Sequence, residues 1–238
     1  MDIAANIAAI RERMTVACER AGRSPGTVKL MGVSKTHPAT AIREAFDAGL
    51  NLFGENKIQE ARLKIPDCPA AAAFHFIGHL QSNKARDAAR LFAMIQGVDK
   101  LSTATELSKK AEALSRDLPI LLEVNIAGEA SKFGYSPAAV LAELEQILDL
   151  PRLELHGFMT VPPYSVDPER SRPCFRRLRE LKEQCEQLAG IPFPELSMGM
   201  SGDFETAIEE GSTLIRVGTA IFGTRKYANL KKELAEQP

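Results

Sequence analysis

The stretch from Lys29 to Asn56, KLMGVSKTHPATAIREAFDAGLNLFGEN, contains one complete strand–helix–strand unit. Its first seven residues and its last five are short and mostly apolar, as buried parallel strands are. Between them, Pro38 to Ala48 has helical spacing and is followed by Gly49, a residue type that commonly ends helices. A strand, a helix and a second strand in this order indicate a parallel sheet with a helical crossover.

The same alternation continues to the end of the chain. Six further apolar runs are predicted strands: Phe74–Leu80, Ala93–Asp99, Pro119–Asn125, Glu154–Thr160, Glu195–Ser201 and Thr213–Gly223. Helices are predicted after Asn56 and at Asn83–Leu91, Leu101–Ser115, Pro137–Leu148, Glu169–Leu188 and Phe204–Glu210. Eight units close a (β/α)8 (TIM) barrel, an α/β fold that reaches 238 residues as one domain, so we expect a single domain over 1–238.

Two segments stand outside this alternation. Ahead of the first strand, Ile3, Ile7, Ile10 and Met14 recur at three- and four-residue steps, which predicts an extra amphipathic helix. We expect it to cover the floor or the flank of the barrel. After the sixth strand, four prolines between residues 162 and 173 predict a long ordered loop.

The charge balance and the cysteine pattern argue against several classes of protein, including nucleic-acid-binding and membrane proteins. With 30 basic and 31 acidic residues, the net charge of -1 provides no general attraction for nucleic acid or an anionic membrane. The basic stretch Gln81–Arg90 lacks interleaved aromatic residues and is typical of a solvated helix face. The four cysteines form no CxxC pair, and no signal peptide or membrane-spanning apolar run is present, so we expect a soluble cytoplasmic protein.

In such a barrel, side chains at the carboxyl ends of the strands form the active face. Lys35 ends the first strand after an apolar run, and a desolvated lysine has a lowered pKa that frees its amine for Schiff-base chemistry. The alternative is a strand-end lysine that reaches out to water. Asn56 ends the second predicted strand, and Met159 is the residue before the end of the sixth, so both are expected at the same mouth.

Two loops have the features of a phosphate site. Ser201 and Gly202 open a short helix after the seventh strand, and Gly218 and Thr219 lie near the last strand. Loops after strands seven and eight commonly bind phosphate in these barrels. The alternatives are a plain helix N-cap for Ser201 and close strand packing for Gly218.

Arg216 lies within an apolar strand, and a guanidinium that faces the barrel must be paired because it stays charged. A pyridine nitrogen is one such partner, and a strand-end acid, Glu55 or Glu123, is another; both can hold together. Arginine beside a pyridine nitrogen leaves that nitrogen unprotonated, which weakens carbanion chemistry on the ring.

The histidines do not indicate a metal site. His75 and His79 have the spacing of a helical zinc motif, but their flanks predict a strand, where four residues span about 13 Å. His37 follows Lys35 closely and is expected near the mouth, and His156 begins a strand and is expected at the core or floor.

Five segments resemble the pyridoxal phosphate homeostasis protein family (YggS type, also called proline synthetase co-transcribed homologues), whose fold is like the alanine racemase N-terminal barrel. They are GVSKTHPATAIREAFDAGLNLFGENKIQEAR, HFIGHLQSNK, LLEVNIAGEASKFGY, HGFMTVPP and LSMGMSGDFETAIEEGSTLIRVGTAIFG, and they span nearly the whole chain. Departures are small: Phe74 stands where relatives often have Trp, and Lys57-Ile58 replaces an aromatic-Val pair.

The resemblance implies the cofactor pyridoxal 5'-phosphate (PLP) and a role for each candidate. It makes Lys35 the Schiff-base lysine and Arg216 the partner of the ring nitrogen. It makes Ser201, Gly218 and Thr219 phosphate binders, beside Gly202, and places Asn56 and Met159 in the ring pocket.

A PLP carrier and a PLP enzyme remain to be distinguished. Racemases that share this barrel use a second domain that supplies a tyrosine opposite the lysine, and only fifteen residues follow Gly223 here. Tyr164 is the one weak candidate among Tyr135, Tyr164 and Tyr227. We therefore expect a non-catalytic, monomeric PLP carrier that supplies apo PLP-dependent enzymes. The alternatives are a small PLP-dependent amino-acid enzyme such as a racemase, or a lysine-dependent aldolase or phosphosugar-binding barrel without PLP.

Overall fold

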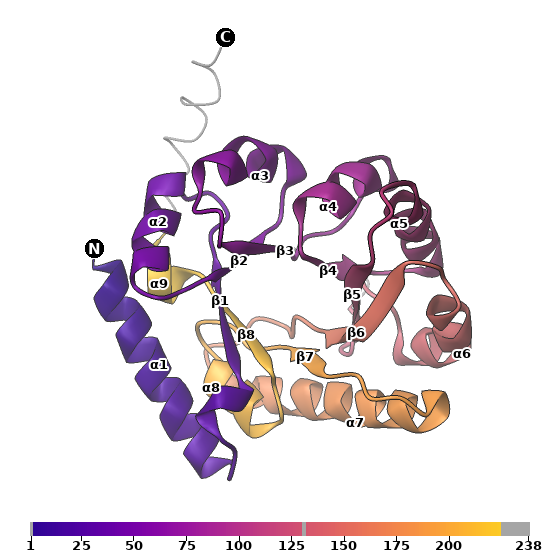
Figure 1. Ribbon diagram of the computed structural model, residues 1–238. Coiled ribbons are helices and arrows are strands. Elements are labelled where there is room, and N and C mark those ends of the chain that lie inside the picture. Colours follow the sequence, from indigo (N-terminus) through magenta and orange to yellow (C-terminus); the bar gives the residue numbers. More distant parts are fainter. Residues whose placement is uncertain (1, 130–131, 225–238) are drawn as a thin grey trace.

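The computed structural model describes residues 2–129 and 132–224. Eight parallel strands form a closed barrel in sequence order, and helices surround it (Figure 1). The strands are β1 (Lys29–Val33), β2 (Leu52–Glu55), β3 (Ala73–Phe76), β4 (Met94–Val98), β5 (Leu118–Glu123), β6 (Leu153–Met159), β7 (Glu195–Ser197) and β8 (Leu214–Val217). Closure comes from β1 and β8, whose register runs from Lys29 beside Leu214 to Gly32 beside Val217. The predicted barrel is confirmed.

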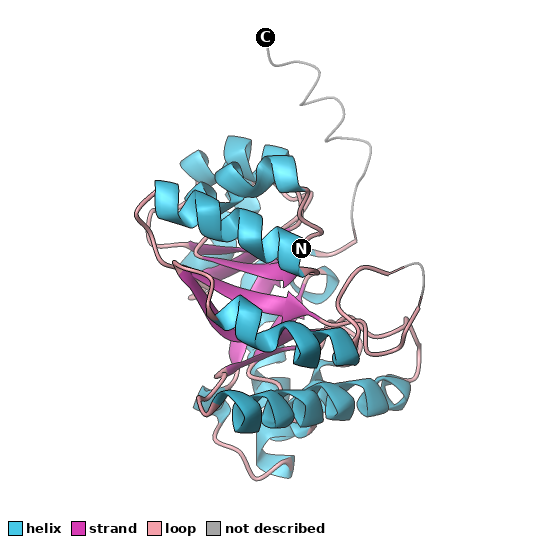
Figure 2. Cartoon of the chain, turned by 90° about the vertical axis from the view of Figure 1, so that its right-hand side faces the viewer, coloured by secondary structure: helices cyan, strands magenta, loops and turns pink. Residues whose placement is uncertain are grey.

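The helices alternate with the strands, so that the strands lie between helices on either side (Figure 2). They are α1 (Ile3–Arg20), α2 (Ala39–Asp47), α3 (Ile58–Lys64), α4 (Ala85–Leu91), α5 (Leu101–Ala113), α6 (Pro137–Leu148), α7 (Arg172–Ala189), α8 (Phe204–Glu209) and α9 (Thr219–Phe222). Four short 3-10 turns complete the described elements: η1 (Pro25–Thr27), η2 (Ile65–Asp67), η3 (Ser82–Lys84) and η4 (Pro168–Ser171).

The predicted extra helix is α1, and it lies on the flank of the barrel. Asp2 caps it by accepting a 2.9 Å hydrogen bond from the Ala5 amide. Its buried stripe, Ile3, Ile7, Ile10 and Met14 with Ala17 and Cys18, packs against α2, α8 and α9. The helix therefore covers the part of the barrel where β8 meets β1 (Figure 1). It lies beside α8 and α9, the two helices next to the predicted phosphate loops.

Several strands are shorter than their apolar runs. β7 ends at Ser197 because the chain turns at Gly199, whose φ is +96°. A Cβ there would lie 2.6 Å from the Cβ of Ala207, so only glycine lets α8 pack this closely. The run predicted as the last strand is also divided: β8 ends at Val217, and residues 219–222 form one helical turn. An apolar run predicts which residues are buried, but pairing with the neighbouring strands of the barrel determines where a strand ends.

No helix within residues 2–129 and 132–224 combines the length and the apolarity needed to span a bilayer.

Candidate functional site

A cavity of about 460 Å³ opens at the carboxyl ends of the strands. Seven of the eight residues predicted for the site line it: Lys35, Met159, Ser201, Gly202, Arg216, Gly218 and Thr219. The Pro-rich segment after β6 also reaches the cavity, through Val161, Pro163, Tyr164 and Ser165. Its volume lies within the range of small-molecule sites, and it lies at the end of the barrel that carries function in this fold.

Asn56 is the residue that does not line this cavity. It is half-buried directly after β2, and its backbone faces Gly78. A Cβ on Gly78 would come within 2.4 Å of the Asn56 carbonyl oxygen, so the two loops touch through main chain. The expected contact of Asn56 with a bound ring stays a prediction.

Lys35 lies in a tight turn, Ser34 to His37, immediately after β1. The next residue, Thr36, has φ +67°, a left-handed conformation that a β-branched residue rarely adopts. Its amide donates a 2.6 Å hydrogen bond to Oε1 of Glu60. The strained turn therefore persists because neighbouring groups fix it.

A buried ion cluster fixes the same turn from behind. The Lys64 ammonium, 8 % exposed, donates to the carbonyl oxygens of Ser34 at 2.9 Å and His37 at 3.1 Å, at the two ends of the turn. It also pairs with Glu55 at 2.7 Å and with Glu60 at 2.9 Å. One buried cation thus holds both ends of the segment that presents Lys35, while Glu60 holds its middle.

Within this cluster, Glu55 is fully buried and accepts a 2.6 Å hydrogen bond from the Ser34 hydroxyl. Burial raises the pKa of Glu55, and Lys64 and Ser34 act in the opposite direction. Because Glu55 is committed to Lys64, it does not serve as the partner of Arg216 that the sequence left open.

Arg216 is 4 % exposed and bonded mainly to neutral acceptors. Its Nη1 donates to the carbonyl oxygen of Ser197 at 2.6 Å and to the Ser197 hydroxyl at 2.7 Å, and its Nη2 donates to the Thr160 carbonyl oxygen at 2.8 Å. These bonds use three of the five guanidinium N–H groups and fix the plane of the side chain at the cavity wall.

The predicted acid partner of Arg216 is only partly realised. Among the described residues no carboxylate forms an ion pair with the guanidinium, although the charge of Glu123 acts on it through space. Burial lowers the pKa of Arg216 to about 10, which still leaves it charged at neutral pH. Burial likewise raises the pKa of Glu123 to about 6, against the effect of Arg216. A cation without a contacting anion remains available to a ligand.

The two predicted phosphate loops meet at the cavity. The amide of Ala220 donates to the Ser201 hydroxyl at 3.4 Å, which joins the start of α9 to the loop after β7. Within residues 2–129 and 132–224, no protein acceptor bonds the backbone N–H groups of Ser201, Gly202 or Gly218. Unbonded amides from two loops, close to a buried guanidinium, form an anion-binding arrangement.

The structural alternatives for these loops are realised only in part, because the Ser201 hydroxyl accepts from an amide in the first turn of α9. Ser201 is not a helix N-cap, because α8 starts after Asp203. Close packing does not require glycine at position 218 either: a Cβ there would make an ordinary 3.4 Å contact with Val33.

The histidines and tyrosines occupy other positions. His37 lines the cavity as expected; His79 stacks on Phe133 with ring centroids 3.7 Å apart. His156 is bonded to Glu154 at 3.2 Å, and no cluster of three or more metal-ligating side chains occurs among the described residues. Tyr164 is 92 % exposed, Tyr135 is buried with a raised pKa, and Tyr227 lies outside the described residues.

The residues that hold the Lys35 turn in place were not predicted from the sequence. Neither Lys64 nor Glu60 was among the residues predicted for the site. One signal was present: Lys64 follows Glu60 by four residues on a short helix, a spacing that brings the two side chains together. Nothing in the spacing showed that both would be buried beneath the Lys35 turn.

Known proteins resemble this chain over most of its length. Residues 5–226 match the family described as "Alanine racemase, N-terminal domain". A protein named "Pyridoxal phosphate homeostasis protein" from Aquifex aeolicus is 42 % identical over 228 residues, covering 95 % of this chain and 100 % of its own. The protein of the same name from Pseudomonas aeruginosa is 44 % identical, over 94 % of this chain and 96 % of its own.

Solved structures show the same relationship. PipY of Synechococcus elongatus, known with and without PLP bound, is 38 % identical and covers 93 % of this chain and 100 % of its own, with TM-scores of 0.82 and 0.84. An alanine racemase of Clostridium difficile has a TM-score of 0.70 at 14 % identity over 94 % of this chain and 57 % of its own, a likeness of fold alone. The chain belongs to the pyridoxal phosphate homeostasis protein family.

Proposed function

We propose that this chain binds PLP at the barrel mouth through Lys35 and serves in keeping and delivering it inside the cell. The observation that carries the proposal is the composition of one cavity. It joins a half-buried lysine, a buried arginine and two loops whose backbone N–H groups have no protein acceptor among the described residues. These are the groups that an aldehyde, a pyridine nitrogen and a phosphate ester require.

Each residue has a separate task in this proposal. When bound, PLP supplies an aldehyde that an amine captures with the loss of one water, and Lys35 is the amine on the turn that Lys64 and Glu60 hold. Ser201, Gly202, Gly218 and Thr219 would hold the phosphate. Arg216, oriented by Ser197 and Thr160, would face the ring nitrogen, and Met159 and Asn56 would contact the ring.

The tyrosines favour a carrier over a racemase. A racemase needs an acid/base group fixed on the face of the substrate opposite the lysine. Tyr164 lines the cavity, but its side chain is 92 % exposed, and Tyr135 is buried away from the cavity wall. Neither described tyrosine is held where that role requires. Arg216 at a ring nitrogen would also keep it unprotonated, which disfavours carbanion chemistry.

Attachment can be tested on the wild-type protein. PLP should give a visible absorption band that borohydride bleaches, and the reduced adduct should map to the peptide that carries Lys35. Lys57, exposed and outside the cavity, is the matched internal control. An adduct on Lys57 or Lys132 in place of Lys35 would show that the attachment site is wrong.

The carrier role needs a second measurement. Loaded protein should transfer PLP to an apo PLP-dependent enzyme, and turnover on a panel of D- and L-amino acids should be absent. Steady turnover would establish an enzyme instead. The proposal includes a cytoplasmic, single-domain monomer, so sedimentation should give a mass near 26 kDa.

A further inference from the structure

Asp203 is the only carboxylate among the described residues that line the mouth cavity. It follows Ser201 and Gly202 directly and precedes α8. The cationic side chains on the same wall are Lys35 and Arg216, beside His37. An acid is unexpected next to loops that would hold a phosphate, because like charges repel.

The contacts of Asp203 give it a structural task. Its Oδ1 accepts a 2.7 Å hydrogen bond from the Met200 amide, which closes a ring around Ser201 and Gly202. Its Oδ2 accepts a 3.0 Å bond from the Ser171 hydroxyl at the end of η4. Asp203 therefore fixes the shape of the loop with one oxygen and its position with the other.

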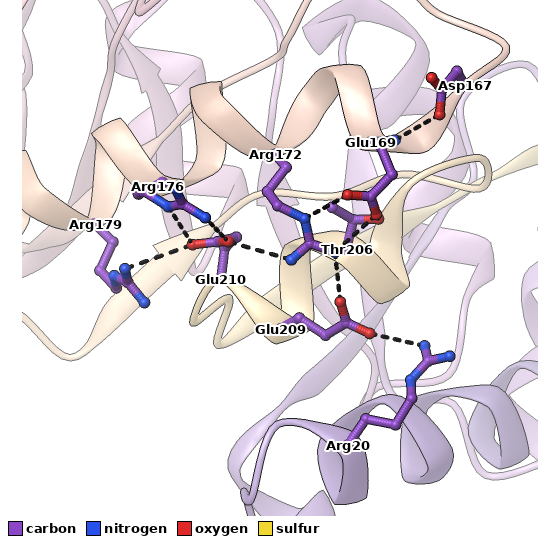
Figure 3. Close-up of polar contacts among 9 residues, drawn as sticks. All are labelled: Arg20, Asp167, Glu169, Arg172, Arg176, Arg179, Thr206, Glu209 and Glu210. Carbon is purple, nitrogen blue, oxygen red and sulfur yellow. Dashed lines mark hydrogen bonds and ion pairs between the residues drawn. The ribbon is translucent and has the colours of Figure 1, made fainter.

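The segment that Asp203 contacts, η4 and the start of α7, is itself held in place by ion pairs (Figure 3). Arg172, the residue after Ser171, binds Glu169 at 2.7 Å and reaches α8 through Glu209 at 2.6 Å and Glu210 at 3.2 Å. Arg176 adds a 3.0 Å bond to Glu210. These ion pairs join α7 to α8, so the Asp203 loop is attached to two helices that cannot separate easily.

The charge of Asp203 is not neutralised by a contact. Among the described residues no cation forms an ion pair with it, and its electrostatic effect extends to the buried Arg216 guanidinium. A carboxylate in this position therefore subtracts from the positive potential that the cavity offers a phosphate dianion.

We propose that Asp203 is a positioning residue with two opposed effects on phosphate: its hydrogen bonds shape the Ser201–Gly202 loop, and its charge weakens the hold of that loop. The inference rests on the proposed function, in which the loop binds the phosphate of PLP. A carrier must release what it binds, and an uncompensated negative charge beside the phosphate speeds release while the shape of the site is kept.

Two substitutions separate geometry from charge. In Asp203→Asn, the amide oxygen still accepts from Met200 and the amide group donates to Ser171, so the loop keeps its shape without the charge. We expect PLP to bind about threefold to tenfold more tightly and to leave correspondingly more slowly, with less than a twofold change for unphosphorylated pyridoxal. Asp203→Ala removes both bonds, and PLP should bind about tenfold more weakly than in Asp203→Asn.

Glu205→Gln is the matched control. It removes the same charge two residues away, but Glu205 pairs with Arg13 at 2.8 Å outside the cavity, so PLP affinity should change less than twofold. Affinities are read by spectral titration on the full chain, and thermal melting reports folding. If Asp203→Asn is folded and binds PLP no more tightly than wild type, or if PLP and pyridoxal change alike, the inference is overturned. Wild-type protein that does not prefer PLP to pyridoxal would instead overturn the phosphate site of the proposed function.

Discussion

Arg216 donates a 2.7 Å hydrogen bond from Nη1 to the Ser197 hydroxyl, and this bond sets the direction of a hydrogen-bond chain across the barrel. Because the hydroxyl accepts from Arg216, its own proton goes to Oε1 of Gln96 at 2.7 Å. Gln96 then directs its Nε2 to Nδ1 of His75 at 2.9 Å. A charge at the mouth is thereby linked to the orientation of groups on β7, β4 and β3.

Replacement of Ser197 tests this chain. Ser197→Ala leaves Oε1 of the buried Gln96 without its donor, while Arg216 keeps the two carbonyl oxygens. We expect a loss of about 1–3 kcal/mol in the free energy of unfolding, measured with urea. The exposed Ser102, changed to Ala, should stay within about 0.5 kcal/mol of wild type. Equal losses of stability at both positions would show that the hydrogen bond from Ser197 to Gln96 does not contribute to the free energy of unfolding.

His75 makes stability depend on pH. Burial lowers its pKa to about 4, and Nδ1 must stay unprotonated to accept from Gln96. Between pH 6.5 and pH 4 the unfolded chain therefore binds more protons than the folded one at this site. The contribution is complete above pH 6.5 and falls by up to about 3 kcal/mol as the pH drops to 4.

The measurement is the difference in unfolding free energy between wild type and His75→Asn across this range, since that variant keeps an acceptor but does not titrate. The difference should vary with pH below 6.5 and be constant above it. Glu123, with a pKa raised to about 6, acts in the opposite sense and cancels in the comparison. A difference that is constant from pH 4 to 7 would show that His75 is not buried in its neutral form.

Substitution of Lys64 should lower the free energy of unfolding more than most single substitutions in this fold. Lys64→Met leaves the fully buried Glu55 without its cation and releases both ends of the Lys35 turn, at about 3–5 kcal/mol. Adding Glu55→Gln should recover part of the loss. Lys110→Met, which breaks the partly exposed surface pair with Glu106, should destabilise the protein far less. Urea denaturation compares the three, and a mild Lys64→Met would mean that the cluster does not hold the turn.

Thr219→Glu tests the phosphate loops directly. An added carboxylate at the start of α9 should weaken PLP binding far more than pyridoxal binding, by about tenfold or more, because it faces the phosphate. Ser24→Glu adds the same charge in an exposed position before β1, at the opposite end of the barrel, and should leave both affinities unchanged. Spectral titration gives the two constants, and equal losses for both ligands would remove the phosphate from these loops.

Patterns local to the chain predicted the architecture well. Strand–helix alternation from Lys29 onward gave eight units, and the Ile3 to Met14 stripe gave α1. Element ends were less accurate: the turn at Gly199 and the break after Val217 shortened two strands. Apolar periodicity reports which residues are buried, whereas the length of a strand depends on the wall it joins.

The sequence by itself determined the number of strand–helix units, the chemical groups at the strand ends and the family resemblance. Only the tertiary structure decided which groups meet: Glu55 turns to Lys64 and leaves Arg216 to neutral oxygens, and Asp203 joins the Ser201 loop to Ser171. The physical reason is the distance along the sequence between the residues that interact. Burial and helix spacing are encoded by neighbours a few residues apart, while hydrogen-bond and ion partners come from strands and loops that barrel closure brings together.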